Sequence, residues 1–288
     1  MLRKTAVVSL LTSVAFAQLQ IPSAISSDCA SFLEKLNDDP ALDGCTAPLV
    51  SATSRYTSGS QWDAPAIEST LSNICSSTSC SRPTMRAQLA SFYQACPEEV
   101  LTNEDVKKIY DTLYTIVPLK DAMCAKDEIT NNYCMTQTSK AVAAVEASSG
   151  LNVEQMQRYL APSGTLNFTA FSVVNLPFLF LTPSLDSEAL CTTCTRNILS
   201  SYISWENDIM YAPGLSQSVL LGKQNELIRA IKESCGPNFL LGAVQAAGGI
   251  SGDTISGLTN AATSVFSVGL QWLVVSVTGV WAVASLGA

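Results

Sequence analysis

Cys191 and Cys194 are separated by two threonines, the spacing with which proteins carry out thiol–disulfide exchange. At the start of a helix such a pair can act as a redox dithiol, because the helix N-terminus lowers the pKa of a thiol. That chemistry usually follows a βαβ pattern, whereas the sequence upstream supplies only an apolar segment broken by proline. We therefore expect two structural disulfides from one helix face, with Cys235 as the obvious partner, and keep a redox dithiol and metal binding as alternatives.

Acidic side chains gather in two places that could supply paired carboxylates. Asp38, Asp39 and Asp43 form one group, and Glu98 and Glu99 are adjacent. A glycosidase needs two carboxyl groups at a defined separation across a cleft. Because carboxylates on helix faces and turns are usually solvated, a carboxylate-based enzyme is an alternative and not the expectation.

Histidine is absent from the chain, and neither a Gly-x-Ser-x-Gly motif nor a P-loop occurs. These absences exclude histidine bases, Ser-His-Asp triads and the common nucleotide signature. The sequence thus predicts no catalytic residue, no cofactor and no metal site, and a protein that is not an enzyme. The net charge of −8 disfavours nucleic acid as a partner, since an acidic surface repels phosphates.

The ten cysteines all lie between two apolar ends of the chain. Their even number and a secretory route predict five disulfides. Spacing does not give the connectivity, except that a Cys124–Cys134 bond would close the polar loop between these two residues. The predicted disulfide cysteines are Cys29, Cys45, Cys75, Cys80, Cys96, Cys124, Cys134, Cys191, Cys194 and Cys235.

The first end, residues 1–17, has the order of a secretory signal peptide. Arg3 and Lys4 precede a short apolar stretch that closes on small residues, with cleavage expected after Ala17. A buried N-terminal helix is the alternative. Such a stretch is too short to cross a bilayer about 30 Å thick.

The second end, residues 265–288, is an apolar tail that follows a small and polar linker, residues 248–264. Small residues, a polar spacer and a terminal apolar tail form the signal for a glycosylphosphatidylinositol (GPI) anchor. Ser251 and Asn260 are the two candidate attachment residues. A retained transmembrane helix and a buried core helix are the alternatives. The expected partners are therefore the membrane, through a lipid anchor or a C-terminal helix, and cell-wall polysaccharide or surface proteins.

Between the ends, residues 18–247, the dominant period is helical. The clearest helix follows Thr102, expected as its N-cap with Leu101 and Val106 as a hydrophobic staple, and ends at Pro118. Its apolar side chains are expected on one face: Val106, Ile109, Tyr110, Leu113 and Val117. A second helix is expected over residues 187–205, with an apolar stripe of Leu190, Cys194, Ile198, Tyr202 and Trp205. A third is expected over residues 218–234 and stops at Gly236. Weaker helices are expected over residues 27–36, 84–95, 139–147 and 153–160.

Residues 171–181 are apolar but contain Pro177, which predicts a buried extended segment or crossover. This run could also line a lipid-binding cavity, although core is the better reading. Asn167 stands in the Asn-Phe-Thr sequon and is the expected glycosylation site.

Several short segments resemble an uncharacterised family of fungal secreted proteins: residues 91–96, 133–134, 175–181, 191–197, 211–215 and 242–249. Members of that family look like cell-surface proteins with a signal peptide and often a C-terminal anchor signal. Their shared domain has no assigned function, so the resemblance implies a surface location and no catalytic residue.

Together these features predict a mostly α-helical, disulfide-braced bundle with one short extended apolar segment, held at the outer leaflet of the plasma membrane or in the cell wall. One continuous bundle is favoured over two domains, although composition shifts near residues 148–164. The expected function is non-enzymatic, in wall organisation, adhesion or partner contact. A module that binds lipid or another small apolar ligand, and a thiol–disulfide or carboxylate-based enzyme, are the alternatives.

Overall fold

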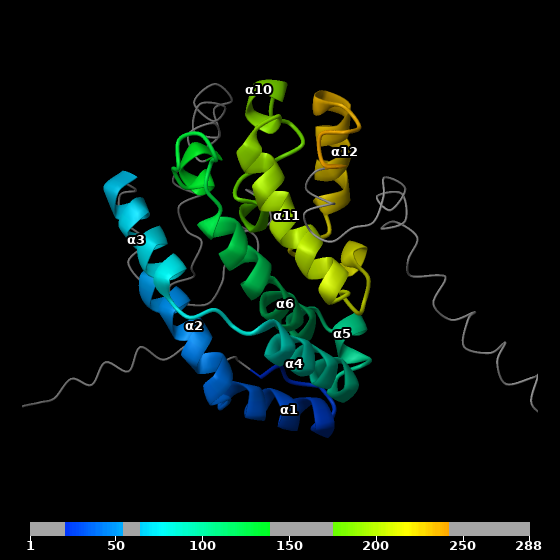
Figure 1. Cartoon of the computed structure of the whole chain (residues 1–288). Coiled ribbons are helices and arrows are strands. Elements are labelled where there is room, and N and C mark those ends of the chain that lie inside the picture. The colour runs from blue at the N-terminus through cyan, green and yellow to red at the C-terminus, as the bar shows by residue number, and fades with distance from the viewer. Residues whose placement is uncertain (1–20, 54–63, 139–174, 242–288) are drawn as a thin grey trace, which may run out of the picture.

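The computed structural model describes residues 21–53, 64–138 and 175–241, and within them helices are joined by turns without any β-strand (Figure 1). The first part of the chain forms α1 (Ser27–Asn37), α2 (Pro40–Thr53), α3 (Ala64–Ser76), α4 (Arg82–Ala95), α5 (Glu99–Thr102) and α6 (Glu104–Cys124). The second forms η2 (Leu176–Phe178), α10 (Ser187–Leu190), α11 (Thr193–Asp208), η3 (Leu215–Gln217) and α12 (Gln224–Cys235). The prediction of a mostly helical protein is confirmed. The helices expected over residues 139–147 and 153–160 lie outside the described residues.

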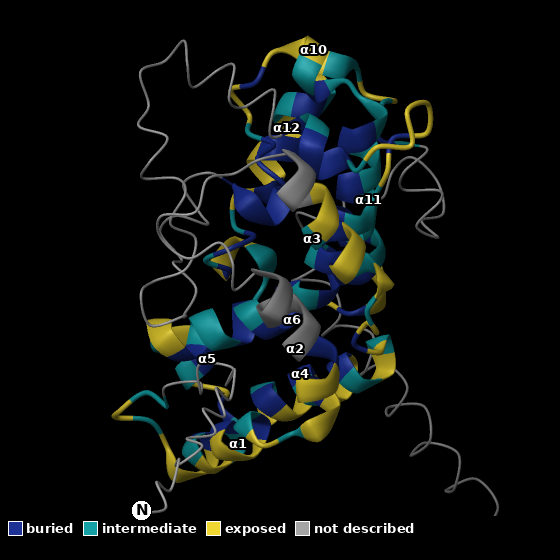
Figure 2. Ribbon diagram, turned by 90° about the vertical axis from the view of Figure 1, so that its left-hand side faces the viewer, coloured by how far each residue is buried: buried dark blue, intermediate teal, exposed yellow. Residues whose placement is uncertain are grey.

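The centre of the bundle is the contact of α6 with α11. α3, α4 and α5 also pack on α6, while α1 lies on α4 and α12 lies on α10. Figure 2 shows the result: α1 exposes its outer side, and buried residues line α6 and α12. The buried hydrophobic side chains of both parts of the chain form one core.

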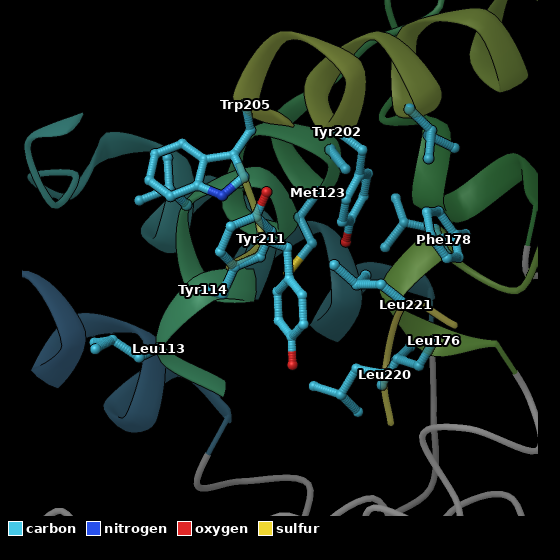
Figure 3. Packing of buried hydrophobic residues seen from close by; sticks show 14 of the residues in the cluster. Leu113, Tyr114, Met123, Leu176, Phe178, Tyr202, Trp205, Tyr211, Leu220 and Leu221 are labelled. Atoms are coloured by element: carbon cyan, nitrogen blue, oxygen red, sulfur yellow. The ribbon is translucent and has the colours of Figure 1, made fainter. Parts of the chain in front are cut away.

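Aromatic rings join the two central helices (Figure 3). The Tyr114 ring of α6 meets the Trp205 ring of α11 edge-on, with centroids 5.8 Å apart, and meets Tyr211 at 5.1 Å. Such edge-to-face pairs add stabilisation beyond the area that they bury. The Tyr114 hydroxyl donates to the backbone carbonyl of Ile209 at 2.6 Å, so this buried polar group is satisfied.

The face predicted for the helix after Thr102 packs on the core. Four of its members, Val106, Tyr110, Leu113 and Val117, are buried, and the fifth, Ile109, is partly buried. Its predicted end at Pro118 is wrong, since α6 continues to Cys124 with the proline inside it. A proline removes one helical hydrogen bond, but Ala122 and Met123 beyond it are buried in the core. Tertiary packing therefore carries the helix past the proline.

The predicted N-cap of this helix is also wrong. Asn103 caps α6, and its side-chain oxygen accepts hydrogen bonds from the amides of Asp105 and Val106. Thr102 instead ends the short helix α5. Leu101 is 49% exposed and so does not form the expected staple.

The helix expected over residues 187–205 is split in two. Asp186 caps α10 and Thr192 caps α11, each by accepting from a backbone amide three residues later. The expected apolar stripe is nevertheless confirmed, since its members are all buried: Leu190, Cys194, Ile198, Tyr202 and Trp205.

The other helices predicted within the described residues are present as α1, α4 and α12, although their bounds differ from the predicted ones. α12 begins at Gln224 and not at residue 218, because residues 219–223 form turns, and it ends at Gly236 as expected. α1 and α4 agree with the helices expected over residues 27–36 and 84–95, and serines at positions 26 and 81 cap them. α2, α3 and α5 were not predicted.

The expected extended segment is a compact turn where the structure describes it, from residue 175 onward. Leu176–Phe178 form the 3-10 helix η2, flanked by Asn175 and Leu179 in left-handed conformations. Residues 175–181 are all buried, and the Tyr202 hydroxyl donates to the Pro177 carbonyl. Proline and the left-handed residues make this apolar run coil into the core instead of extending along it.

Candidate functional site

All ten cysteines are paired in five disulfides, as predicted, and none is free. The pairs are Cys29–Cys96, Cys45–Cys80, Cys75–Cys124, Cys134–Cys194 and Cys191–Cys235. Three bonds lie within residues 29–124 and two lie within residues 134–235. No disulfide therefore connects these two stretches of the chain.

The predicted Cys124–Cys134 bond is wrong. Cys124 bonds to Cys75 and Cys134 bonds to Cys194. The loop between Cys124 and Cys134 is closed by its backbone instead: the Cys134 amide donates to the Ala125 carbonyl at 2.9 Å. Each cysteine is thus left to tie its own end of the loop to a different helix.

The Cys191 and Cys194 pair spans the break between α10 and α11. Cys191 follows the last residue of α10, whereas Cys194 lies in the first turn of α11. Their sulfur atoms accordingly bond to different partners, Cys235 and Cys134. The expected bond to Cys235 is confirmed, and the two sulfurs do not form a dithiol pair with each other.

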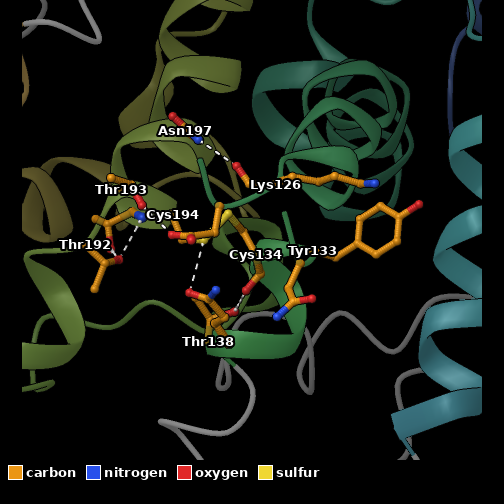
Figure 4. The surroundings of a disulfide bond; sticks show 12 residues. Lys126, Tyr133, Cys134, Thr138, Thr192, Thr193, Cys194 and Asn197 are labelled. Carbon is orange, nitrogen blue, oxygen red and sulfur yellow. Dashed lines mark hydrogen bonds between the residues drawn. A yellow bond between two sulfur atoms is a disulfide. The ribbon is translucent and has the colours of Figure 1, made fainter. Parts of the chain in front are cut away.

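The Cys134–Cys194 bond fixes a tight loop, residues 126–133, which we call the braced loop (Figure 4). Asp127 organises it, because its carboxylate accepts from the amides of Ile129 at 3.1 Å and Thr130 at 2.8 Å. The same carboxylate accepts from the Thr193 hydroxyl of α11 at 2.6 Å. These donors, Thr193 first, lower the pKa of Asp127 to about 2.

Further contacts hold both ends of the braced loop. Asn197 of α11 donates to the Lys126 carbonyl at 3.0 Å. The Lys126 ammonium lies 4.7 Å from the centre of the Tyr133 ring. At the loop's outer side, Ile129 is 88% exposed. The arrangement presents an apolar side chain from a backbone that is already ordered, which lowers the entropy cost of a contact with a partner.

Sequence reasoning missed a buried carboxyl group, Glu206 of α11. Its Oε2 atom accepts from the Gln224 side-chain amide of α12 at 3.0 Å. Burial raises the pKa of Glu206 to about 8, against a smaller opposing effect of that hydrogen bond. Its position next to Trp205, on the buried stripe of α11, is the sequence signal that could have found it.

A second buried carboxyl group, Asp111 of α6, serves as an anchor. It accepts from the Tyr211 hydroxyl and from the amides of Val219 and Leu220. Burial raises its pKa, although the hydrogen bonds oppose that shift. Asp111 therefore holds the irregular segment before α12 against α6.

In each of the two predicted carboxylate groups, one member accepts a hydrogen bond from a residue distant in sequence. Asp39 accepts from the Gln88 side chain, and Glu99 accepts from the Ser26 amide at 2.8 Å. Hydrogen bonds from Ser26 lower the pKa of Glu99, so this carboxylate is held ionised.

Other predicted positions lie outside the described residues: the leader of residues 1–17, Asn167, Ser251, Asn260 and the tail of residues 265–288. Within residues 21–53, 64–138 and 175–241, no helix combines the length and the apolar character that a membrane crossing requires.

A family model described as a domain of unknown function, DUF7729, matches residues 14–244. No curated protein and no solved structure matches the chain. The match agrees with the resemblance to a family without an assigned function.

Proposed function

The chain belongs to the DUF7729 family, which supplies no activity, and from its own residues we propose that it is an anchored extracellular protein that makes non-enzymatic contacts with surface partners. The observation that carries this proposal is the pairing of every cysteine. Proteins with many structural disulfides are typical of oxidising compartments outside the cytosol. The two apolar ends also support secretion and anchoring. Residues 1–17 have the order of a secretory signal, and residues 248–288 have that of a GPI-anchor signal.

The thiol–disulfide alternative has less support than partner contact. A redox dithiol needs two sulfurs that can bond to each other, and Cys191 and Cys194 are bonded elsewhere. The ligand-binding alternative gains nothing from residues 175–181, because this apolar run is buried in the core. The braced loop, in contrast, supports contact with a partner, wall organisation or adhesion, since Ile129 is displayed on an ordered backbone.

The anchor is tested on intact cells that make the full-length protein. Treatment with a phosphatidylinositol-specific phospholipase should release the protein into the medium, and peptide mapping of that material should give the five disulfides described above. A variant that ends before residue 265 should reach the medium without the enzyme. Substitution of Ser251 or Asn260 by a bulky residue identifies the attachment site. A cytosolic protein with free thiols and an intact C-terminal tail would contradict the proposal.

The contact is tested at Ile129. Chemical cross-linking of cells that carry wild-type protein should capture surface or wall partners, and Ile129→Asp should reduce the captured amount several-fold. Leu101→Asp is the matched control, because Leu101 is an exposed aliphatic side chain of the same size as Ile129 but lies on α5, outside the braced loop. Equal capture by the wild type, Ile129→Asp and Leu101→Asp would show that the braced loop does not contact the partner. That result would not bear on the proposed anchor.

A further inference from the structure

Glu206 and Gln224 form a buried contact between α11 and α12. The exposed fractions of the two residues are 5% and 2%. One hydrogen bond joins them, from the Gln224 amide to Glu206 Oε2, at 3.0 Å. The second carboxyl oxygen of Glu206 and the side-chain oxygen of Gln224 have no hydrogen-bond partner among the described residues. An ionised Glu206 would therefore carry a buried charge that a single neutral amide stabilises.

No positive charge compensates Glu206 in the described part of the chain. None of the ion pairs there includes Glu206. The titratable groups that interact with it are Tyr114 of α6 and Tyr202 of α11, and burial raises the pKa of both. From α12 the facing group is Gln224, which is neutral. A buried carboxyl group with tyrosines and an amide around it is favoured in its protonated form.

The contact lies at one end of α12, and a disulfide lies at the other. Cys235, the last residue of α12, is bonded to Cys191. Gln224 is the first residue of α12, and the N-cap residue Lys223 makes no capping hydrogen bond with its side chain. The C-terminal end of α12 is thus fixed covalently. Before its N-terminal end, the amides of Val219 and Leu220 bond to Asp111 of α6, and from Gln224 onward that end is held by packing and by the Glu206 contact.

We propose that Glu206 and Gln224 form a pH-sensitive latch, which holds the N-terminal end of α12 on α11 in acidic surroundings and loosens it as the surroundings become neutral or alkaline. The direction follows from protonation. Below pH about 4.5 the carboxyl group is neutral in both the closed and the opened form, so closure is unopposed. Between pH 4.5 and about 8 only the opened form ionises, and the latch weakens by up to about tenfold per pH unit. Above pH 8 both forms are ionised and the weakening stops.

The latch is tested with Glu206→Gln, which keeps the accepting oxygen and cannot ionise. Hydrogen exchange of the Leu227 amide reports on the first turn of α12, because this amide bonds to the Lys223 carbonyl. At pH 4 we expect similar exchange in the wild type and the variant, because the carboxyl group is then mostly neutral in both forms. At pH 7.5 exchange in the wild type should be at least tenfold faster than in the variant. Glu226→Gln, an exposed change on the same turn, is the control and should behave as the wild type.

Equal exchange in the wild type and Glu206→Gln at both pH values would overturn the latch. A second measurement does not depend on any variant: carbon-13 NMR of the side-chain carboxyl groups follows the titration of Glu206 in the wild-type protein. We expect a midpoint near pH 8. A midpoint between pH 4 and 5, the ordinary range for glutamate, would also overturn the proposal.

Discussion

The acidic residues Asp127 and Glu206 have pKa values shifted in opposite directions, because one is surrounded by donors and the other is buried with a single amide. Asp127 accepts from loop amides and a threonine hydroxyl, which stabilise its charge. Glu206 is buried beside aromatic rings, which favours its neutral form. The two groups therefore give the protein opposite dependences on pH at the two ends of α11.

Asp127→Asn tests the acid side of this behaviour. Because the pKa of Asp127 is lowered to about 2, its stabilising contribution is present above pH about 4 and is lost as the pH falls towards 2. We expect the wild type to lose stability over that window and the variant to lose less, which urea unfolding at pH 2 to 5 measures. Glu128→Gln, in the same loop, is the control. Parallel pH profiles for wild type and Asp127→Asn would show that the carboxylate does not brace the loop.

Tyr114→Phe tests the hydrogen bond in the centre of the core. Removing the hydroxyl leaves the buried carbonyl of Ile209 without this donor. We expect the free energy of unfolding to fall by about 1–2 kcal/mol, measured by chemical denaturation. Tyr93→Phe, at a half-buried position, should change it by less than about 0.5 kcal/mol. If Tyr114→Phe also lowered the free energy of unfolding by less than about 0.5 kcal/mol, ring packing alone would fix Tyr114.

At the scale of an element, the braced loop depends on its disulfide to α11. Replacing Cys134 and Cys194 together by alanine removes a cross-link between residues 60 apart in the chain. From the entropy that the unfolded chain regains, we expect the free energy of unfolding to fall by about 4 kcal/mol. We also expect faster hydrogen exchange of the Thr130 amide, which bonds to Asp127. Removing Cys75–Cys124, with a separation of 49 residues, should cost a similar free energy but leave Thr130 exchange unchanged. Faster exchange in both variants would contradict a local role for Cys134–Cys194.

Helix faces could be predicted from sequence and helix ends could not, for reasons visible in α6 and α11. Residues such as Tyr110 and Ile198 follow the 3.6-residue period, which burial enforces. The end of α6 is decided by burial beyond Pro118, and its start by competition between Thr102 and Asn103 for the same cap. The end is an outcome of tertiary packing, which local patterns do not record. The start is a choice between two adjacent residues that can both act as caps, and the sequence pattern does not decide between them.

For the candidate site, the number of disulfides could be predicted and most of their partners could not. The even number of cysteines and the predicted secretory route give the number of disulfides. Which cysteines pair depends on which helices lie side by side in the fold. Cys191–Cys235 was predictable because both residues stand at helix ends. Cys134–Cys194 was not, because it requires the packing of residues 60 apart in the chain. Glu206 was missed because its partner Gln224 lies on another helix.

Across the whole molecule, the disulfides differ in access to reductant. The cysteines of Cys75–Cys124 and Cys191–Cys235 are half-buried, whereas those of the other three bonds are buried. Thiol–disulfide exchange requires attack on an accessible sulfur atom. Under native conditions we expect a small thiol to open these two bonds first and the remaining three only when the protein unfolds. Timed alkylation and peptide mapping give the order, and simultaneous loss of all five would contradict it.

The partition of the disulfides between residues 29–124 and 134–235 has a consequence for proteolysis. One peptide bond cleaved inside the braced loop would turn the protein into two polypeptides with no covalent link. A cleavage between residues 45 and 80, or between 134 and 194, would leave the fragments tied by a disulfide. A molecule nicked in the braced loop would stay together through noncovalent packing, such as that of α6 against α11, and would separate in urea without any reductant.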